Sequence, residues 1–426
     1  MKIAIAGYGI EGKASYEYWN TGEHEITIAD ERTEIELPNG VKSIVGEGAF
    51  SKLEGFDVVI RTASLPPNNI TTDGKIWSAT NEFFAKCPAP IIGVTGTKGK
   101  GTTCSLIASI LRAAGKNVHL VGNIGTPGLE ILPQIQSEDI VVYELSSFQL
   151  WDIERSPHVG VCLLIEPDHM NVHADMTEYV TAKSNIARFQ QPSDAFFFHP
   201  TNEYAAAIAL QTSAQVNARY DCAEDRPSVY FDAHDFRFQN EAICSLDALQ
   251  LRGEHNRENA CAALSVAKYL GATNEAIEKG LRDFTGLPHR LKFVAEKNGV
   301  AYYDDSISTT QGSAIAALSS FTQPKVIILG GSSKGTSYDK VIAKCAATNS
   351  KIIAIGETAG QIVEAAARLG AECVQQTGGM KDVVTQAAAM APAGSVVILS
   401  PASASFDMFK NYADRGDQFI ATVEAL

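Results

Sequence analysis

A glycine-rich segment, GVTGTKGKGTT at residues 93–103, follows an apolar run and precedes a helical pattern. A helix N-terminus and the lysine Lys100 both attract negative charge, so this segment is suited to hold phosphates. The usual phosphate loop has Ser or Thr directly after its lysine, whereas this chain has Gly101. Thr102 and Thr103 follow at once and can offer a hydroxyl to Mg2+. The segment therefore predicts a nucleotide-phosphate site.

Carboxylates and imidazoles follow the next apolar runs of the chain. Glu144 ends the run DIVVYE, at the expected carboxyl edge of a parallel sheet, where it can supply a magnesium ligand or project into solvent. Asp168, His169 and His173 lie close together after the following run, a setting that favours a ligand role over a structural one. Lys183 lies in a helical segment and, taken alone, is interpreted as a solvated lysine.

A second glycine loop, GYGIEG at residues 7–12, fits the pattern G-x-G-x-x-G directly after a strand. Asp30 ends the next strand, where a ribose-binding acid is expected in a dinucleotide-binding domain. This pairing favours an NAD-dependent oxidoreductase. The alternative is a glycine turn that serves another phosphate-containing ligand, or none.

Short apolar runs alternate with helix-length segments through most of the chain, which predicts an α/β protein with largely parallel sheets. Proline-bearing breaks at KCPAP, residues 86–90, and FTGLPHR, residues 284–290, divide these runs into three groups. We predict domains over residues 1–89, 90–284 and 285–426.

Net charge, cysteine spacing and apolar stretches indicate which partners and which cell compartment to expect. The 426 residues carry a net charge of −14, which disfavours nucleic acid and anionic lipid as general partners. The eight cysteines form no C-x-x-C pair, so we expect reduced thiols and no zinc site. Without a signal peptide or a membrane-length apolar stretch, we expect a cytoplasmic protein.

Several longer motifs resemble the Mur ligase family, the ADP-forming amide ligases of cell-wall precursor synthesis. The most specific are ELSSFQL at 144–150, GLPHR at 286–290 and SPASASFDMFKNYADRG at 400–416. Further matches are G-x-x-G-x-x-G-K at 93–100, GNIG at 122–125, DHM at 168–170, HNREN at 255–259 and LGG-x-x-K at 329–334. Together they cover nearly the whole chain and are most similar to the branch that adds D-glutamate.

The resemblance implies three domains: a Rossmann-like N-terminal domain for a UDP group, a central P-loop ATPase-type domain with a parallel or mixed sheet, and a Rossmann-like C-terminal domain. GYGIEG then becomes a cradle for UDP without a nicotinamide. The residues that would bind the UDP-sugar or D-glutamate are Gly9, Ile10, Glu11, Asp30, Arg32, Asn123, Ser146, Thr309, Lys334, Ser405, Phe406 and Tyr412.

The resemblance also implies ATP and two Mg2+ ions. The ATP contacts would be Gly96, Thr97, Lys98, Gly99, Lys100, Gly101, Thr102, Thr103, Asn256, Asn259, Arg290 and Asp305. The metal-binding residues would be Thr102, Thr103, Glu144, His169 and Lys183, and the catalytic residues Lys100, Glu144, His169 and Lys183. In this family the lysine at the position of Lys183 is carbamylated by CO2, which turns a cation into a carboxylate-like ligand.

The implied reaction joins UDP-N-acetylmuramoyl-L-alanine to D-glutamate in peptidoglycan precursor synthesis. The substrate carboxylate attacks the ATP γ-phosphate to form an acyl phosphate, and the amine of D-glutamate then displaces phosphate. Because the ligands come from different domains, closure of the C-terminal domain is expected before chemistry. We expect a monomer that binds neither nucleic acid nor membrane.

Three alternatives stay open. A folylpolyglutamate-type ligase would use a different amino acid or acceptor and shares Gly101. Ile307 stands where the D-glutamate branch usually has lysine, and RTASLPPNN at 61–69 replaces its SPG-type loop, so contacts there can differ. An NAD-dependent dehydrogenase leaves the Lys100 loop without a role, and a nucleotide-binding switch leaves the donors of the C-terminal segment unexplained.

Overall fold

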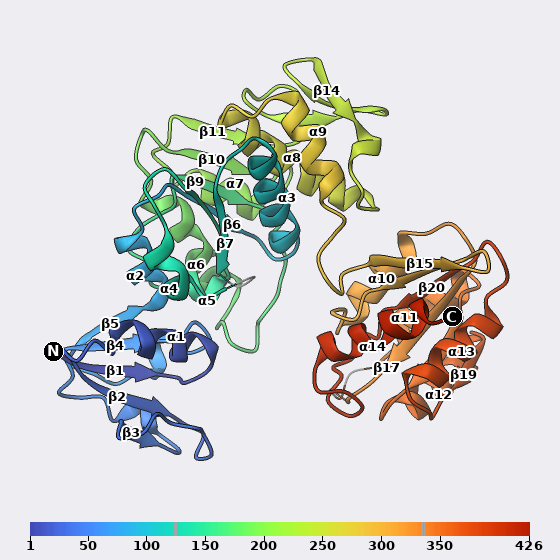
Figure 1. The fold of residues 1–426 in the computed structure, drawn as a ribbon, viewed down its shortest axis with the longest axis horizontal. Helices are drawn as coiled ribbons and strands as arrows, with labels where there is room; N and C mark the ends of the chain where they lie inside the picture. Colours follow the sequence, from blue (N-terminus) through green and yellow to red (C-terminus); the bar gives the residue numbers. More distant parts are fainter. Residues whose placement is uncertain (123–125, 334, 336) are drawn as a thin grey trace. The chain divides into compact units, whose positions relative to one another are not determined.

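The structure is a computed structural model that describes residues 1–122, 126–333, 335 and 337–426. The described chain divides into two compact units, residues 1–250 with 254–284, and residues 251–253 with 285–426. Parallel sheets flanked by helices dominate both units (Figure 1), so the predicted α/β class is confirmed. The division of the first unit at residues 89 and 90 stays a prediction.

The N-terminal sheet is parallel, with strand order β3-β2-β1-β4-β5. Its strands are β1 (Lys2–Ala6), β2 (Glu25–Asp30), β3 (Lys42–Val45), β4 (Val58–Arg61) and β5 (Lys75–Ser78). Its helices are α1 (Ile10–Trp19), η1 (Ala49–Ser51), η2 (Pro67–Asn69) and α2 (Ala79–Lys86). The strand order reverses between β1 and β4, and sheets of this kind bind ligands outside the carboxyl ends of the strands at such a point.

The central sheet is also parallel, with strand order β11-β10-β9-β6-β8-β7. Its strands are β6 (Ile91–Thr95), β7 (Val118–Gly122), β8 (Ile140–Glu144), β9 (Val159–Cys162), β10 (Ala195–Phe198) and β11 (Val216–Arg219). Its helices are α3 (Lys100–Ala113), α4 (Gly128–Ile131), η3 (Leu132–Gln134), α5 (Ser147–Leu150), α6 (Met176–Arg188), α7 (Glu203–Ala209), α8 (Glu254–Tyr269) and α9 (Asn274–Asp283). A small antiparallel sheet of β12 (Val229–Phe231), β13 (Asp235–Phe238) and β14 (Glu241–Ser245), followed by η4 (Leu246–Ala248), precedes α8.

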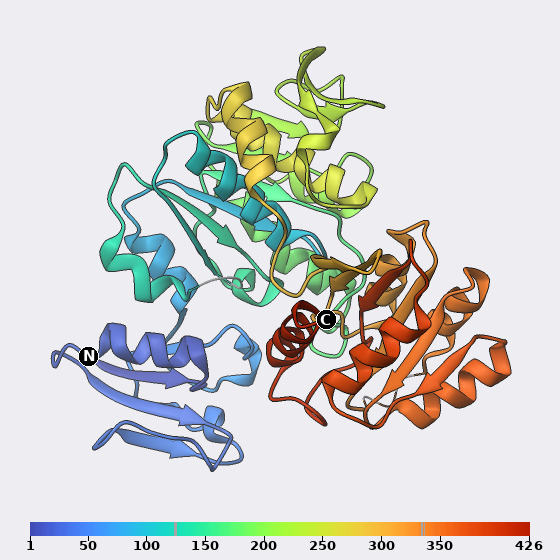
Figure 2. The same ribbon diagram turned by 45° about the vertical axis from the view of Figure 1, so that its right-hand side comes forward.

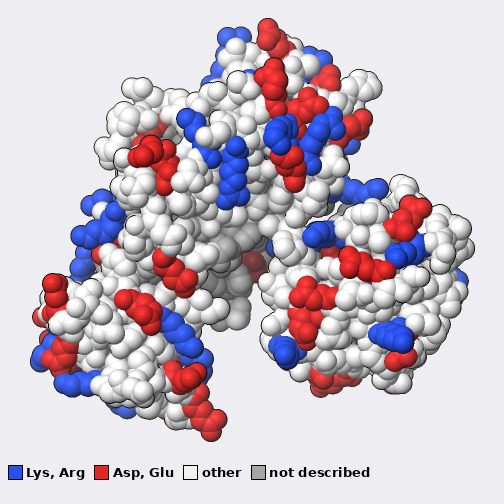
Figure 3. Space-filling view, in the orientation of Figure 1, with Lys and Arg blue, Asp and Glu red and all other residues white. Residues whose placement is uncertain are grey.

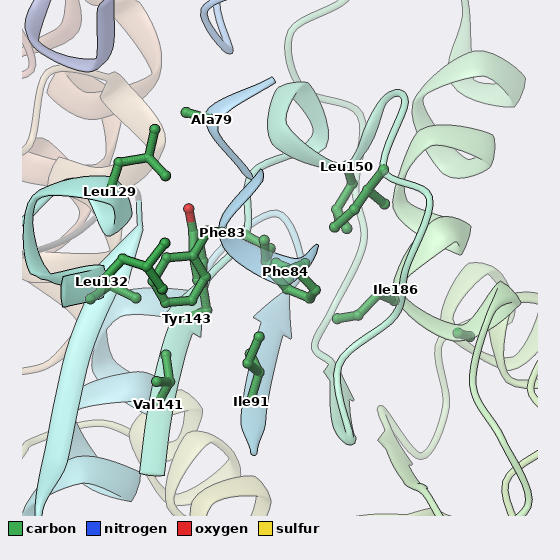
Figure 4. Close-up of a cluster of buried hydrophobic side chains, with 14 of the residues drawn as sticks. Ala79, Phe83, Phe84, Ile91, Leu129, Leu132, Val141, Tyr143, Leu150 and Ile186 are labelled. Atoms are coloured by element: carbon green, nitrogen blue, oxygen red, sulfur yellow. The ribbon is translucent and has the colours of Figure 1, made fainter. Parts of the chain in front are cut away.

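One hydrophobic cluster includes residues of both large sheets of the first unit. It contains Ile3 and Ile60 of the N-terminal sheet and Ile91 and Tyr143 of the central sheet. Phe83 of α2 packs against Tyr143 at a ring-centroid distance of 5.3 Å (Figure 4). Burial of this apolar surface is the main driving force that holds the elements of the unit together.

The second unit has a six-stranded sheet of order β15-β16-β20-β17-β18-β19, in which only the edge strand β15 is antiparallel. Its strands are β15 (Lys292–Lys297), β16 (Val300–Asp304), β17 (Lys325–Gly330), β18 (Lys351–Ile355), β19 (Cys373–Gln375) and β20 (Val396–Leu399). Its helices are α10 (Gln311–Ser319), α11 (Asp339–Ala347), α12 (Ala359–Leu369), α13 (Met380–Met390) and α14 (Tyr412–Glu424).

Helices cover both faces of this sheet (Figure 2). Val326 and Ile328 of β17 join the cluster that contains residues of α13 and α14. The alternate residues Ile327 and Leu329 join the cluster that contains residues of α10, α11 and α12. Successive strand residues point to opposite faces, so the continuous apolar run KVIILGG reflects a strand buried on both sides.

Charged side chains are interspersed on the face of the molecule shown in Figure 3, where Asp and Glu alternate with Lys and Arg in small groups. Among the described helices, none combines the length and the apolar composition that a membrane crossing requires.

Candidate active site

The phosphate loop connects the buried strand β6 to α3. Gly96 and Gly99 have φ angles of 146° and 85°, which favour glycine. A Cβ at Gly96 would lie 2.7 Å from Cβ of Leu163, and one at Gly99 would lie 2.3 Å from Oδ1 of Asn259. The first N–H groups of α3 have no acceptor within the helix, so this end is suited to bind phosphate oxygens.

Two lysines converge on one backbone oxygen of this loop. Nζ of Lys100 lies 3.1 Å from the carbonyl oxygen of Gly96 and 3.0 Å from that of Thr97. Nζ of Lys183, on α6, lies 3.0 Å from the same Gly96 oxygen and 3.4 Å from Oγ1 of Thr95. Lys183 is only 1% exposed, so its interpretation as a solvated helix lysine is wrong.

The surroundings of Lys183 disfavour its charge. Burial is the main cause that holds the pKa of Lys183 well below its ordinary value, and the neighbouring charge of Lys100 adds to it. Its hydrogen-bond acceptors are a carbonyl and a hydroxyl, and Nζ lies 4.6 Å from the ring centroid of Tyr179. These surroundings therefore favour the neutral amine more than water does.

The rest of the loop is tied to the segment that follows β9. Oγ1 of Thr97 donates to the carbonyl oxygen of Glu166 at 3.0 Å and lies 3.1 Å from the hydroxyl of Tyr179. The exposed Lys98 forms an ion pair with the Glu166 carboxylate at 3.1 Å. These contacts fix the first half of the loop, including the carbonyl groups that Lys100 and Lys183 bind.

The second half of the loop packs against α8. Thr102 and Thr103 are buried near the start of α3, beside the buried Gly101. Oγ1 of Thr103 donates to Oδ1 of Asn259 at 3.5 Å, and Nδ2 of Asn259 donates to Oδ1 of Asn256 at 3.3 Å. Two predicted ATP contacts that are distant in the sequence therefore adjoin the phosphate loop.

The predicted metal ligands differ in their burial. Glu144 ends β8, lies opposite Val94 of β6 and is 5% exposed. The side chain of His169 is 47% exposed, and its Nε2 lies 3.5 Å from Oδ2 of Asp168. The structure therefore holds Glu144 at the carboxyl edge beside the phosphate loop, whereas His169 lies on the surface of the loop after β9.

His173 is buried, unlike its neighbour His169. Its Nε2 lies 2.9 Å from Oγ of Ser147, and its ring stacks on Phe148 at a centroid distance of 5.4 Å. Burial is the main cause that lowers the pKa of His173. The side chain of His173 joins α5 to the loop after β9. It therefore has a structural contact, whereas the side chains of Asp168 and His169 are nearly half exposed.

The donors around the phosphate loop fit a metal that is bound together with phosphate. Among the described residues, no group of three or more His, Cys, Asp or Glu side chains could hold a metal ion by itself. Mg2+ typically binds through one or two carboxylates together with substrate phosphates and waters. Glu144 and the hydroxyls of Thr102 and Thr103 suit that arrangement. They are too few to bind a metal ion without ligands from a phosphate or water.

The N-terminal glycine loop lies against the ends of β2 and β4. Both oxygens of Asp30 accept hydrogen bonds, from the backbone N–H of Tyr8 at 2.7 Å and from the side chain of Arg32 at 2.9 and 2.7 Å. The hydrogen bonds from Arg32 are the main cause that lowers the pKa of Asp30 to about 2. Asp30 and Arg32 therefore form a fixed, ionised pair beside the loop.

The three predicted contacts at the start of α1 have different environments. Gly9 caps the helix, and a Cβ placed there would meet nothing within 4 Å. The side chain of Ile10 is 77% exposed. Oε2 of Glu11 accepts the backbone N–H of Ala63 at 2.6 Å, so this side chain connects α1 to the loop after β4. Gly9 and Ile10 are accessible to a ligand, while Glu11 has a structural partner.

Ser146 lies between Glu144 and α5 and caps that helix. Its Oγ accepts the backbone N–H of Gln149 at 3.2 Å, and Oε1 of Gln149 accepts the backbone N–H of Ser146 at 3.0 Å. This reciprocal capping satisfies two donors and fixes the turn after β8. The motif ELSSFQL is thus a strand end followed by a capped helical turn.

In the second unit, Asp305 lies at the carboxyl end of β16 and is 4% exposed. Its oxygens accept hydrogen bonds from Ser308 at 2.5 Å, Ser400 at 2.7 Å and the backbone N–H of Leu291 at 3.0 Å. Burial outweighs these bonds and raises the pKa of Asp305 to about 6. The side chain is therefore an internal junction of three loops, and Arg290, next to Leu291, is exposed.

A buried histidine adjoins this junction. Nδ1 of His289 lies 2.6 Å from Oδ2 of Asp304, and both side chains are almost fully buried. A Cβ at Gly416 would lie 2.1 Å from the same nitrogen, so glycine at the start of α14 admits the ring. The histidine of the motif GLPHR is therefore buried inside the second unit.

Arg415 is a fully buried residue that the sequence analysis missed. Its guanidinium donates to the hydroxyl and carbonyl oxygens of Ser306 at 2.9 and 2.8 Å and to the carbonyls of Ser403 and Ala404 at 3.1 and 3.3 Å. Burial is the main cause that lowers its pKa to about 10. The sequence around Arg415 does not indicate that this arginine is buried, because arginine is usually exposed.

The predicted amino-acid contacts lie around these loops. Ser405 is buried, whereas Phe406 is 75% and Tyr412 is 43% exposed. Thr309 is half-buried at the end of the loop after β16. Asn123 and Lys334, two further predicted contacts, lie outside the residues that the structure describes.

Comparison with known proteins gives the family. Residues 94–267 match the family model "Mur ligase middle domain", and residues 289–403 match "Mur ligase, glutamate ligase domain". A protein named UDP-N-acetylmuramoylalanine–D-glutamate ligase from Symbiobacterium thermophilum is 36% identical, with 100% of this chain and 98% of the relative covered. Its namesake from Clostridium tetani is 32% identical over 100% of this chain and 97% of that relative.

Solved structures share the fold at low sequence identity. MurC from Thermotoga maritima superposes with a TM-score of 0.65 at 15% identity and covers 100% of this chain and 99% of its own. MurF from the same organism, in complex with ADP, has a TM-score of 0.61 at 16% identity over 99% of this chain and 94% of its own. These neighbours show the fold. The family models and the full-length relatives show that the chain belongs to the Mur ligase family.

Proposed function

We propose that this chain joins the carboxylate of UDP-N-acetylmuramoyl-L-alanine to the amino group of D-glutamate, with conversion of ATP to ADP and phosphate. The observation that carries the proposal is the similarity over the full chain to relatives named for that reaction, at 32 to 36% identity. The phosphate loop with its two convergent lysines supports the use of ATP, as does the ADP complex of the MurF neighbour.

The proposed chemistry has two steps. The acceptor carboxylate attacks the γ-phosphate of ATP, which forms an acyl phosphate and releases ADP. The amine of D-glutamate then attacks the acyl carbon, and phosphate leaves with the bond to carbon broken. The N-terminal loop of α3 would hold the phosphates, and Lys100 would offset their negative charge.

We propose that Glu144, His169 and the threonines after Lys100 hold two Mg2+ ions together with ATP. Bound Mg2+ would supply charge stabilisation for the transferring phosphoryl group. The buried Glu144 and the accessible His169 would serve different ions, because Glu144 ends the strand β8 whereas His169 is exposed in the loop after β9.

We further propose that Lys183 carries a carbamate. CO2 reacts with a neutral amine, and the burial that depresses the pKa of Lys183 favours this form. The reaction would release a proton and place an anionic carbamate beside the cationic Lys100, where a cation at Lys183 is disfavoured. Incubation with isotopically labelled bicarbonate and carbon NMR of the protein should give a carbamate signal that the Lys183→Met variant lacks.

The residues of the second unit would bind the amino acid and the outer part of ATP. The proposed D-glutamate contacts are Thr309, Lys334, Ser405, Phe406 and Tyr412. The proposed ATP contacts are Arg290 and Asp305 of this unit, and Asn256 and Asn259 of the first unit. Asp305 would act by shaping its loop, since its oxygens already accept internal hydrogen bonds. We also propose a cytoplasmic monomer with domains at 1–89, 90–284 and 285–426, to be checked by light scattering and limited proteolysis.

The decisive experiment measures phosphate release with a panel of acceptors and amino acids. We expect release to require UDP-N-acetylmuramoyl-L-alanine and D-glutamate together, with L-glutamate and D-aspartate inactive. Turnover with a pteroate acceptor and L-glutamate would instead identify a folylpolyglutamate-type ligase. ATP hydrolysis that is indifferent to the amino acid would reject the proposed specificity.

A further inference from the structure

Arg61, the last residue of β4, is fully buried within the first unit although it carries a charge. Its Nε and Nη2 bind Oδ2 and Oδ1 of Asp152 at 2.6 and 2.5 Å. Asp152 lies just after α5 of the central sheet, ninety-one residues further along the chain. This bidentate pair therefore joins the N-terminal sheet to the central sheet with a fixed geometry.

The remaining donors of Arg61 also have acceptors. Nη2 donates to the carbonyl oxygen of Phe148 at 2.9 Å, and Nη1 lies 3.3 Å from each of the carbonyl oxygens of Thr62, Ala63 and Leu65. All five N–H groups of the guanidinium are thus engaged. A planar, five-donor group is required for this pattern, because a lysine has only three donors that radiate from one atom.

One end of this network lies at the acceptor cradle, by which we mean residues 7–12 and 62–65. Thr62 contacts Gly7 so closely that a Cβ on the glycine would lie 2.3 Å from Oγ1 of Thr62. The backbone N–H of Ala63 donates to Glu11 of the glycine loop. By binding the carbonyls of the 62–65 segment, Arg61 fixes the wall of the cradle that faces the glycine loop.

The other end lies at the carboxyl edge of the central sheet. Phe148, whose carbonyl binds Arg61, packs its ring on His169 and His173 at centroid distances of 4.9 and 5.4 Å. It belongs to α5, which begins three residues after Glu144. The guanidinium therefore contacts the wall of the cradle at one end. At the other end it contacts α5, whose Phe148 packs on His169, the proposed metal ligand.

We propose that Arg61 is a positioning residue that sets the distance between the acceptor cradle and the phosphate loop, so that the acceptor carboxylate meets the γ-phosphate of ATP. The inference rests on the proposed function and adds a residue that touches neither ATP nor acceptor. The reaction requires two bound substrates to be aligned, and a displacement of about 1 Å can cost roughly 100-fold in rate.

A second ion pair across the same pair of sheets serves as a matched control. Lys75 of β5 lies 3.1 Å from Glu154, but both side chains are more than half exposed. Exposed pairs contribute little because water and salt screen them. Loss of Lys75 therefore removes an ion pair between the same two regions without removing a buried, multidentate junction.

The experiment compares Arg61→Met, Arg61→Lys, Asp152→Asn and Lys75→Met for steady-state kinetics, for ATP binding by calorimetry and for thermal unfolding. We expect Arg61→Met to lower kcat by about 10- to 100-fold and to raise the acceptor KM by about 10-fold, with the Kd for ATP within about 2-fold of wild type. Arg61→Lys and Asp152→Asn should fall between it and wild type, and Lys75→Met should match wild type.

Equal losses of ATP binding, acceptor binding and thermal stability would assign Arg61 a purely structural role and overturn the inference. So would kinetics within about 2-fold of wild type in a folded Arg61→Met or Asp152→Asn protein. Hydrogen exchange separates this result from a failure of the proposed function, because it needs no turnover. Arg61→Met should speed exchange in both segments 62–65 and 146–152, and unchanged exchange in 146–152 would also contradict the inference.

Discussion

Buried ionisable side chains have different hydrogen-bond partners in the phosphate-loop region of the first unit and in the loop junction of the second unit. Lys183 is buried against neutral oxygens and beside a second lysine, and its pKa is strongly depressed. In the second unit, the carboxylate of Asp305 accepts three hydrogen bonds, and the guanidinium of Arg415 binds oxygens of three residues. The hydrogen bonds of Lys183 go to a carbonyl and a hydroxyl, whereas Asp305 and Arg415 each have several internal hydrogen-bond partners.

The difference separates residues that act on ligands from residues that hold loops in place. An unfavourable local charge persists where a ligand or a modification compensates for it. Internally satisfied charges serve the fold, and their loss destabilises the protein first. We therefore expect substitutions in the first region to remove activity without loss of stability, and substitutions in the second region to reduce both.

Replacement of Lys183 by methionine tests the first half of the comparison. We expect turnover to fall by about 1,000-fold or more, since the amine or its carbamate is lost from the phosphate loop. The free energy of unfolding should stay unchanged or rise by about 1 kcal/mol, because a buried amine whose charge is disfavoured gives way to an apolar chain of similar length. Phosphate release and urea unfolding measure the two effects, and a destabilised Lys183→Met protein would show that Lys183 holds the fold together.

Replacement of Arg415 by methionine tests the second half. The change strands the buried hydroxyl and carbonyl groups that the guanidinium now satisfies, at a cost of about 3 kcal/mol. We expect a lower urea midpoint and a parallel loss of turnover. If Arg415→Met unfolded at the wild-type urea concentration yet lost activity, Arg415 would belong with the ligand-binding residues instead.

Replacement of Asp305 by asparagine tests the buried carboxyl of the second unit through its pH dependence. Burial raises the pKa of Asp305 from 3.8 to about 6, so its contribution to stability is fully present below about pH 4 and is lost as the pH rises through about 6. Across that window, wild type should lose roughly 2 to 3 kcal/mol relative to Asp305→Asn. Urea titrations of both proteins at pH values from 4 to 8 measure this difference. If the stability of the two proteins changed equally with pH, the raised pKa of Asp305 would be contradicted.

Alanine substitutions at Thr102 and Thr103 resolve the first region further. The hydroxyl of Thr103 faces Asn259, so we expect Thr102 to be the hydroxyl that serves Mg2+. Thr102→Ala should raise the Mg2+ concentration for half-maximal turnover by about 10-fold, which corresponds to about 1.4 kcal/mol. Thr103→Ala should change it by less than about 3-fold, and the reverse order would exchange the two roles.

Much of the fold follows from local patterns in the sequence. The apolar runs before GYGIEG, GVTGTKGKGTT and LGGSSKG form the buried strands β1, β6 and β17, because parallel strands covered on both faces are continuously apolar. GYGIEG follows β1 directly, and Gly96 and Gly99 follow β6, as the spacing indicates.

The buried charges could not be foreseen in the same way. Arg61 and Asp152 are ninety-one residues apart, and Arg415 binds Ser306 across one hundred and nine. A charged residue in the sequence predicts exposure unless its partner is known, and the partner is fixed only by the folded chain. The helical pattern around Lys183 likewise gives no sign that the side chain points toward the phosphate loop.

The contact of Gly99 with Asn259 has a consequence for the order in which the protein matures. Thr103 and Asn259 are separated by 156 residues, so the phosphate loop meets its packing partner only after α8 has been synthesised. A nascent chain that ends before Glu254 carries the complete glycine motif but lacks the helix that supports it. We therefore expect competence to bind nucleotide to arise only after α8 has left the ribosome.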